Sequence, residues 1–353
     1  MAGNDAAALP KTMRAHILVK PGEIDLREVP RPTAGPGELV VRVRTALTCG
    51  TDIKAFVRGH PKFPMPTPFG HEFSGEIVEV GPGEATFHEG DAVMAAPTAP
   101  CGECYYCARQ QENLCETVMD TMVLGAYADF IKLPRRIAAV NVYRKPDSIS
   151  FATAALMEPL ACVIHGLDMI SVRPDDTVVL IGAGPISLLH LLALRHAGVG
   201  RIIVVVRSDR RAAEAQRLGA DEVLISDVGV VRDQILARTQ GRGADIVIEC
   251  TGQVEVWEAA PTLARAGGQV VLFGGCRPGT QVRFDTQRLH YDQLRIVSPF
   301  HFTPRAVRRA YELLAGGQLN TAALISGTFP LTELRHALTL HQQGEGVKFA
   351  IEP

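Results

Sequence analysis

Hydrophobic and polar residues alternate with a period of two over much of the first third of the chain. This pattern is clear at residues 38–45 and 74–81, and a Gly-Pro-Gly turn follows the second stretch. Successive strand residues point to opposite faces, so such alternation predicts half-buried β-strands. Glycine and proline break up the rest of residues 13–95. We therefore expect a β-rich unit here, with loops long enough to carry functional side chains.

The pattern changes in the second half, where continuous apolar runs alternate with helical stretches. Buried-type strands are predicted at 175–181, 201–206, 244–250 and 268–273, and helices at 188–194 and 209–218. Strands that alternate with helices indicate βαβ units and a parallel sheet. A later helix is expected at 304–315 and a strand-like tail at 347–351. The overall fold class is therefore α/β.

A glycine-rich turn joins the first predicted strand of this half to its helix. Gly182 and Gly184 permit a tight turn and let the backbone approach a pyrophosphate at the helix N-terminus. Ser187 stands where a third glycine is usual, and it is small enough for helix–strand packing. Thr251 and Gly274 follow later strands, where ligands of such sheets bind. The segment is predicted to bind a dinucleotide.

Length and charge narrow the class of protein. The chain has 353 residues, which predicts two domains. Its formal net charge of -2 favours neither nucleic acid nor an anionic membrane as a partner. No apolar run reaches membrane-spanning length, and the first residues, expected to be a short tail, lack a signal-peptide pattern. We expect a cytoplasmic protein whose ligand is a small molecule.

Four of the eight cysteines crowd into one loop with the spacing C-x2-C-x2-C-x7-C. These are Cys101, Cys104, Cys107 and Cys115. Four thiolates at short range suit a closed tetrahedral zinc site. An iron–sulfur cluster is the competing interpretation, but the C-x3-C-P ending is absent, and a nucleic-acid zinc ribbon would show paired knuckles and a basic face. Three of the other four, Cys162, Cys250 and Cys276, are expected to be buried thiols.

A second set of metal-ligand types lies nearer the N-terminus. Cys49 is followed about twenty residues later by His71 and Glu72, Thr51 adds a hydroxyl, and Glu158 offers a further carboxylate. Zinc accepts thiolate, imidazole and carboxylate ligands. On these residues alone, a buried Cys49 and a surface pair His71–Glu72 remain the alternative.

Taken together, from about Met13 these segments resemble the zinc-dependent medium-chain dehydrogenase/reductase family, in particular its polyol (sorbitol-like) and threonine dehydrogenase branch. The resemblance implies a GroES-like catalytic domain at 1–157 and 298–353 and a Rossmann domain at 158–297. It implies that Cys49 and His71 hold a catalytic zinc, that Glu72 and Glu158 complete its shell directly or through water, and that the four-cysteine loop holds a structural zinc. Thr51 would relay a proton. The implied cofactor contacts are Gly182, Gly184, Pro185, Ile186, Thr251, Gly274, Ser298 and Lys348.

One position departs from that family's pattern of proton relay. Lys54 stands where many members have a histidine three residues after the hydroxyl. It could serve the proton exit, meet an anionic group on the substrate, or simply face solvent.

The end of the second strand bears on the choice between NAD and NADP. NAD-binding sheets usually place a carboxylate there, but the position is Val206, followed by Arg207 and, farther on, Arg211. A guanidinium can bind a 2′-phosphate bidentately. We expect NADP to be preferred, although Asp209 could still reach the ribose and the arginines could be solvated.

The expected reaction is reversible oxidation of a secondary alcohol to a ketone, with a polyol, cyclitol or sugar alcohol as substrate. A threonine-like amino alcohol is second, and a phosphorylated sugar alcohol third, favoured by Lys54, Arg288 and His290. Residues 61–66 are expected to overhang the pocket. A non-catalytic nucleotide-binding sensor and a zinc-free quinone or enoyl reductase are the other classes; both should lack zinc ligands. Family members form dimers and tetramers, so a homo-oligomer is expected.

Overall fold

The computed structural model describes residues 9–60 and 63–353, which form two compact units. The first unit contains the described residues up to 108, residues 115–157 and residues 325–353, and the second contains residues 109–114 and 158–324. The predicted N-terminal tail, and Pro61 and Lys62 of the predicted overhanging segment, lie outside the described residues.

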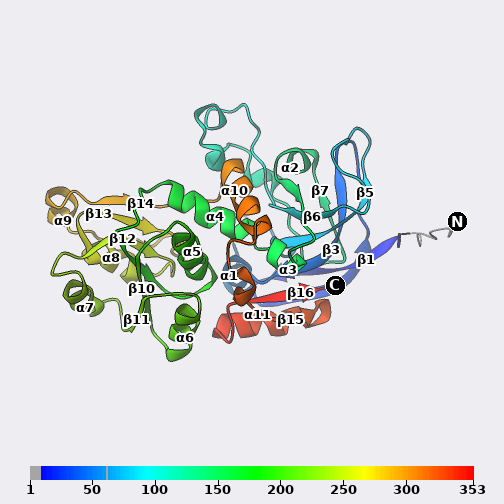
Figure 1. The fold of residues 1–353 in the computed structure, drawn as a ribbon. Helices are drawn as coiled ribbons and strands as arrows, with labels where there is room; N and C mark the ends of the chain where they lie inside the picture. Colours follow the sequence, from blue (N-terminus) through cyan, green and yellow to red (C-terminus); the bar gives the residue numbers. More distant parts are fainter. Residues whose placement is uncertain (1–8, 61–62) are drawn as a thin grey trace. The chain divides into compact units, whose positions relative to one another are not determined.

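The first unit is built on a seven-stranded sheet in the order β15-β16-β3-β5-β6-β8, in which β7 also pairs with β3 (Figure 1). Its strands are β3 (Leu39–Leu47), β5 (Phe73–Val80), β6 (Ala92–Ala95), β7 (Phe130–Leu133), β8 (Val142–Arg144), β15 (Ile325–Pro330) and β16 (Lys348–Glu352). Alternation along β3 buries Val41 and Val43 and leaves Arg44 in solvent, as the sequence pattern predicts. The pairing of β3 with β5 brings the segments beyond their ends together.

A smaller sheet and short helices complete this unit. The sheet has the order β2-β1-β4, with β1 (Thr12–Lys20), β2 (Glu23–Pro30) and β4 (Thr67–Pro68). The helices are α1 (Gly50–Arg58), α2 (Arg135–Val140), α3 (Phe151–Ala154) and α11 (Leu334–Gln343), and the short 3-10 turns are η1 (Cys107–Arg109), η3 (Met119–Thr121) and η5 (Leu331–Glu333). The core packs the β3 and β5 side chains against Phe69, Tyr127 and α11.

The second unit contains a six-stranded parallel sheet in the order β11-β10-β9-β12-β13-β14, flanked by helices (Figure 1). Its strands are β9 (Thr177–Ile181), β10 (Arg201–Val206), β11 (Glu222–Ile225), β12 (Ala244–Glu249), β13 (Ala264–Leu272) and β14 (Arg295–Val297). Its helices and turns are α4 (Met157–Asp168), α5 (Pro185–His196), α6 (Asp209–Arg217), α7 (Val231–Arg238), α8 (Val254–Leu263), α9 (Thr286–Tyr291), α10 (Pro304–Ala315), η2 (Glu112–Leu114) and η4 (Thr321–Leu324). The predicted parallel α/β architecture is confirmed.

The predicted helix at 188–194 is longer in the structure. It begins at Pro185, directly after Gly184, because proline at the first helical position needs no backbone N–H partner and has a suitable φ angle. The helix predicted at 304–315 matches α10, which Thr303 caps by accepting a hydrogen bond from the Ala306 N–H. The stretch Phe151–Asp168, which covers α3 and α4, is apolar enough to span a membrane, but most of it is buried core.

Residues 298–324 lie with the second unit, whereas the sequence prediction returned the chain to the first domain at residue 298. Asp168 at the end of α4 binds Arg305 and Arg309 of α10, and the 3-10 turn η4 packs against α5. These contacts between segments far apart in sequence hold α10 on the parallel-sheet unit, and the chain joins the first unit again at Ile325.

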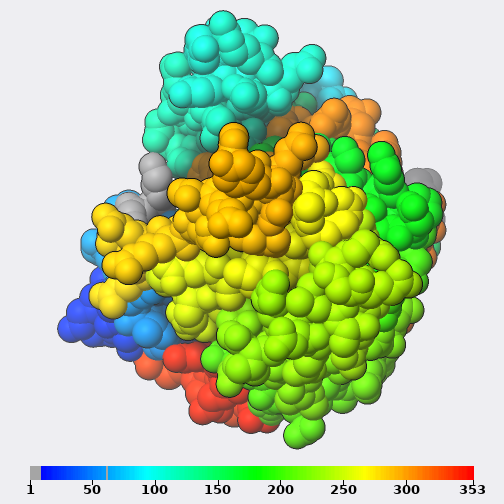
Figure 2. All heavy atoms as spheres, turned by 90° about the vertical axis from the view of Figure 1, so that its left-hand side faces the viewer, coloured from blue at the N-terminus to red at the C-terminus, as the bar shows by residue number. Residues whose placement is uncertain are grey.

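Helix α9 lies on the surface of the second unit, where Figure 2 shows its segment in orange-yellow. None of its residues is buried, and Tyr291 is 79% exposed. The Arg288 guanidinium donates to the carbonyl oxygens of Pro261 and Ala264 and pairs with Asp292. Arg288 is therefore engaged within this unit, which weakens its suggested role toward a phosphorylated substrate.

Candidate metal centre and nucleotide site

Cys49, His71 and Glu72 come together in the first unit. Cys49 caps the N-terminus of α1 just beyond β3, and His71 and Glu72 directly precede β5. Because β3 and β5 are antiparallel and Ala46 lies opposite Phe73, these two segments meet at one edge of the sheet. One potential ligand atom from each of the three residues lies within 4.8 Å of the other two.

Asp52 orients the His71 imidazole. Its Oδ1 lies 2.9 Å from His71 Nδ1, and Asp52 is fully buried. Because a carboxylate only accepts hydrogen bonds, Nδ1 donates and Nε2 keeps its lone pair for a metal. Burial disfavours the imidazolium, but the charges of Asp52 and Cys49 outweigh it and raise the pKa of His71 well above its usual range. Sequence reasoning missed Asp52, although it follows Cys49 by three residues within α1.

Lys348 holds Glu72. Its Nζ donates to Glu72 Oε2 and, at 3.0 Å, to the carbonyl oxygen of Thr48, and both charged side chains are buried. These bonds direct its ammonium group to Glu72, and the predicted contact of Lys348 with the cofactor stays a prediction. Lys348 is the first residue of the buried strand β16, which pairs with β3, and this pairing brings its side chain to the Glu72 carboxylate.

The chemistry of these donors fits a zinc ion. Glu72 Oε1 is buried and has no hydrogen-bond partner. Burial raises the pKa of the Cys49 thiol, and the Glu72 charge raises it further. Placing a buried thiol beside an unpartnered carboxylate oxygen costs folding free energy unless a cation binds both groups. Cys49, His71 and Glu72 therefore form the catalytic Cys/His/Glu site.

Three further residues were predicted to serve this site: Thr51, Lys54 and Glu158. Thr51 lies at the second position of α1 and is partly exposed, and Lys54, one turn on, is exposed. Glu158 belongs to the second unit, in the first turn of α4, where it accepts a hydrogen bond from Cys162 Sγ at 3.7 Å. The proton relay, the role of Lys54 and the place of Glu158 in the zinc shell stay predictions.

The four-cysteine loop forms a second cluster in the first unit. The four Sγ atoms lie within 4.8 Å of one another, and backbone N–H groups of Cys101 and Cys104 donate to Cys115 Sγ and Cys101 Sγ at 3.2 and 3.3 Å. Hydrogen bonds from the backbone of Cys107 and Glu116 lower the pKa of Cys104 to about 6. Backbone donors that favour thiolates and four sulfur atoms at this spacing make the loop a structural zinc site.

A pocket of about 640 Å³ in the second unit lies at the carboxyl ends of β9, β10 and β12. Six predicted cofactor contacts line it: Gly182, Gly184, Val206, Arg207, Arg211 and Thr251. Pro185, Ile186, Gly274 and Ser298 are not among its lining residues, and their contacts with a cofactor stay predictions. Gly182 has φ +101, and a Cβ there would lie 3.2 Å from Thr251, so glycine suits this turn. Ser187 closes the turn by donating to Gly182 O at 2.6 Å.

Glu249 holds the adjoining loop and was not predicted. Its Oε1 accepts hydrogen bonds from Thr251 and, at 2.9 Å, from the Gly252 N–H. Gly252 and Gly274 leave no room for a side chain, because a Cβ on Gly274 would lie 2.2 Å from Gly252 N. Burial raises the pKa of Glu249, which is fully buried. The carboxyl group thus holds the loop after β12, whose Gly252 packs against Gly274 in the loop after β13.

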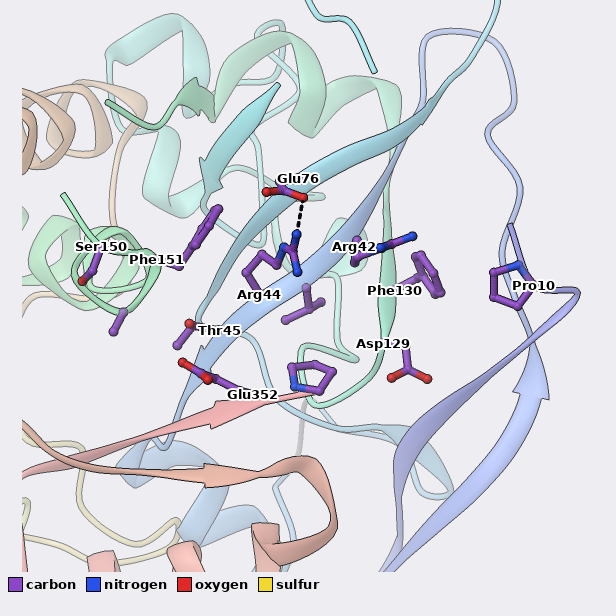
Figure 3. A pocket seen from close by; sticks show the side chains of 13 residues that line it. Pro10, Arg42, Arg44, Thr45, Glu76, Asp129, Phe130, Ser150, Phe151 and Glu352 are labelled. Carbon is purple, nitrogen blue, oxygen red and sulfur yellow. Dashed lines mark hydrogen bonds and ion pairs between the residues drawn. The ribbon is translucent and has the colours of Figure 1, made fainter. Parts of the chain in front are cut away.

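Another hollow, of about 770 Å³, lies in the first unit between β3, β7 and the end of β16 (Figure 3). Arg44 extends toward Glu76, with which it pairs at 2.8 Å, and Asp129 is bound by Arg14. Its described lining residues include none of the candidate metal ligands. Its volume alone therefore does not make it the active site.

Comparisons with known proteins agree with this geometry. Residues 35–146 match the alcohol dehydrogenase GroES-like domain, and residues 185–316 match the zinc-binding dehydrogenase domain. The chain is 31% identical to D-arabitol-phosphate dehydrogenase of Enterococcus avium over 98% of both chains. It is 29% identical to sorbitol dehydrogenase of Halalkalibacterium halodurans over 94% of this chain and 96% of that one. A structure from Sinorhizobium meliloti 1021, described as a zinc-binding dehydrogenase bound to NADP, has a TM-score of 0.89 and 30% identity over 98% of this chain and 100% of that one.

The chain belongs to the zinc-containing medium-chain dehydrogenase/reductase family of alcohol dehydrogenases. It is a zinc-dependent alcohol dehydrogenase that uses NAD or NADP, with a structural four-cysteine zinc site and a catalytic Cys/His/Glu site.

Proposed function

We propose that this enzyme interconverts a secondary alcohol and a ketone on a polyol, cyclitol or sugar alcohol. The observation that carries the proposal is the Cys49, His71 and Glu72 cluster, in which Glu72 Oε1 is buried without a partner. Relatives whose names specify sorbitol and D-arabitol phosphate support this substrate class. The threonine dehydrogenase relative of Bacillus licheniformis, at 27% identity, keeps a threonine-like amino alcohol as second choice.

Each group of the site has a distinct task. When bound, zinc would polarise the substrate oxygen and the nicotinamide would accept the hydride. Cys49 and His71 would hold the metal, and Asp52 keeps the imidazole in the ligating tautomer. Thr51, near the cluster on α1, would relay the hydroxyl proton: its oxygen takes up that proton as its own hydroxyl proton leaves during oxidation, and the transfer runs in reverse during reduction. We also propose that Glu158 completes the shell of the same metal, directly or through water.

We further propose that NADP is preferred. Val206 ends β10 where NAD-binding sheets usually have a carboxylate, and Arg207 and Arg211 line the pocket beside it. Burial and the neighbouring Arg210 lower the pKa of Arg211, so a bound phosphate would stabilise its charged form. The similar structure that holds NADP supports this assignment. Asp209, in the first turn of α6, is exposed and could still bind a ribose hydroxyl.

The experiment that tests the function is a turnover panel. Reduced-cofactor formation is measured with NADP⁺ and NAD⁺ on sugar alcohols, cyclitols, their phosphates and threonine, before and after zinc chelation. Zinc-restored turnover of a polyol, faster with NADP⁺, is expected. Turnover of threonine alone would replace the substrate class, and turnover only with NAD⁺ would overturn the cofactor preference. No turnover, with zinc and cofactor both bound, would favour the nucleotide-binding sensor.

Arg207 allows a sharper test of the cofactor. Arg207→Ala removes one cation beside the proposed 2′-phosphate, and charged hydrogen bonds contribute about 1.5–3 kcal/mol. We expect the ratio of kcat/KM for NADP⁺ over NAD⁺ to fall by about 10- to 100-fold. Arg210→Ala is the matched control, because Arg210 precedes Arg211 in the sequence but is not among the residues that line the pocket. Equal losses with both cofactors would contradict the proposal.

The domain division at residues 157 and 298, a dimeric or tetrameric assembly and a cytoplasmic location are also proposed. Sedimentation of the purified chain tests the assembly.

A further inference from the structure

We propose that Tyr127 is a positioning residue of the catalytic metal site, which acts on the ligand His71 through Asp52. The Tyr127 hydroxyl lies 2.7 Å from Asp52 Oδ2, while Asp52 Oδ1 receives the hydrogen bond from His71 Nδ1. Each oxygen of the Asp52 carboxylate thus has one of these two partners. Tyr127 and Asp52 are fully buried and His71 is 4% exposed, so water does not compete for these bonds.

The Tyr127 ring also fits the backbone that carries His71. Gly70, the residue before His71, has φ +90, and a Cβ there would lie 2.6 Å from the Tyr127 ring. The Tyr127 N–H donates to Phe69 O at 3.0 Å, and the N–H groups of Gly125 and Ala126 both donate to Gly70 O. The segment 125–127 therefore holds residues 69 and 70 in place directly before the ligand.

Ring and hydroxyl have separable roles. The ring packs edge-on against Phe69, with centroids 5.4 Å apart, and phenylalanine could make the same contact. Only the hydroxyl reaches Asp52 and, at 2.9 Å, Leu47 O at the end of β3. Leu47 stands two residues before Cys49. The hydroxyl thus contacts the Cys49 segment on both sides of the ligand and reaches His71 through Asp52, so it is the part expected to affect the metal.

The test is Tyr127→Phe in the full chain, with zinc affinity measured by competition against a chelator. Partners beyond the ligands typically change metal affinity by 10- to 100-fold. We expect zinc to bind the Cys49–His71–Glu72 site about 10-fold more weakly, and the four-cysteine site unchanged. With Co²⁺ in place of zinc, the visible absorption bands of the catalytic site should shift. Tyr291→Phe, at an exposed position, is the control and should change neither readout.

A double-mutant cycle separates positioning from packing. If Tyr127 acts through Asp52, Tyr127→Phe should weaken zinc binding much less in an Asp52→Asn background than in the unmodified chain. An equal loss in both backgrounds, or an unfolding temperature lowered without any change in zinc affinity, would overturn the proposal. The inference rests on the proposed metal site but not on its substrate. Zinc titration needs neither alcohol nor nicotinamide, so silence in the turnover panel would leave this result standing.

Discussion

The two metal sites of the first unit are built in opposite ways. The structural site takes four identical ligands from residues 101–115, and its small core is largely its own, with Cys107, Cys115 and Val118 buried together. The catalytic site takes three different ligands from two segments joined by sheet pairing. Its ligands are held in turn by Asp52 and Lys348, and Lys348 lies 276 residues beyond Glu72.

The difference shows what each site is for. A closed shell of four thiolates has no position left for a substrate, so its contribution is to stability. Three mixed ligands with one carboxylate oxygen unpartnered leave room for a further ligand. Such a site needs outside support to keep its geometry, and buried charged partners provide it. The predictions below test this contrast.

The largest effect is expected from His71→Asn. Loss of the imidazole ligand should empty the catalytic site and lower kcat/KM by about 1000-fold or more, since metal polarisation contributes several kcal/mol and each 1.36 kcal/mol is a factor of ten. Metal analysis should find the four-cysteine zinc retained. Normal turnover by a protein with only that zinc would break the assignment of the two sites.

Cys104→Ser should act on stability instead. Removal of one thiolate weakens a site whose metal binding is coupled to local folding. We expect the unfolding temperature to fall by about 10 °C and protease to cut within residues 101–115, while kcat of the remaining folded enzyme changes less than tenfold. Differential scanning calorimetry and limited proteolysis measure this. Loss of all turnover with no change in the unfolding temperature would reverse the roles of the two sites.

Lys348→Met tests the buried support of Glu72. One buried charge would lose its partner, which typically costs about 3–5 kcal/mol. Denaturant unfolding of the metal-free protein should show this loss, and Lys348→Arg should recover part of it. An exposed pair offers the matched control: Lys20→Met, beside Glu23, should cost less than about 1 kcal/mol. Equal effects at both lysines would mean that Lys348 does not support Glu72 as described.

The smallest effect is expected at Gly102 of the cysteine loop, compared with Gly70. Both have positive φ, but a Cβ at Gly102 meets nothing within 4 Å, whereas one at Gly70 meets Tyr127. Gly102→Ala should cost about 1–2 kcal/mol, the usual penalty of a left-handed conformation. Gly70→Ala should cost more and also weaken catalytic zinc. The free energy of unfolding of both variants is measured by denaturant unfolding. If Gly102→Ala and Gly70→Ala lowered it by the same amount, the proposed role of the Tyr127 contact would be wrong.

Much of the second unit could be predicted because its signals are local. The glycine turn, the apolar strands and Pro185 at the helix start lie within a few residues of each other, and the strands and helices follow closely. The unit to which α10 belongs was not predictable in this way. It depends on Asp168 meeting Arg305 and Arg309, more than 130 residues away.

By itself the sequence determined the α/β class, the four-cysteine cluster, the ligand types at Cys49, His71 and Glu72, and the valine followed by arginine in the nucleotide pocket. Each is a matter of residue type and short spacing. The tertiary structure alone decided that Asp52 bonds to His71 and Tyr127 to Asp52, that Lys348 binds Glu72, and that Glu249 holds the loop after β12. These are buried polar contacts, and burial makes them selective: away from water, each donor must find one particular acceptor, which only the folded chain brings within reach.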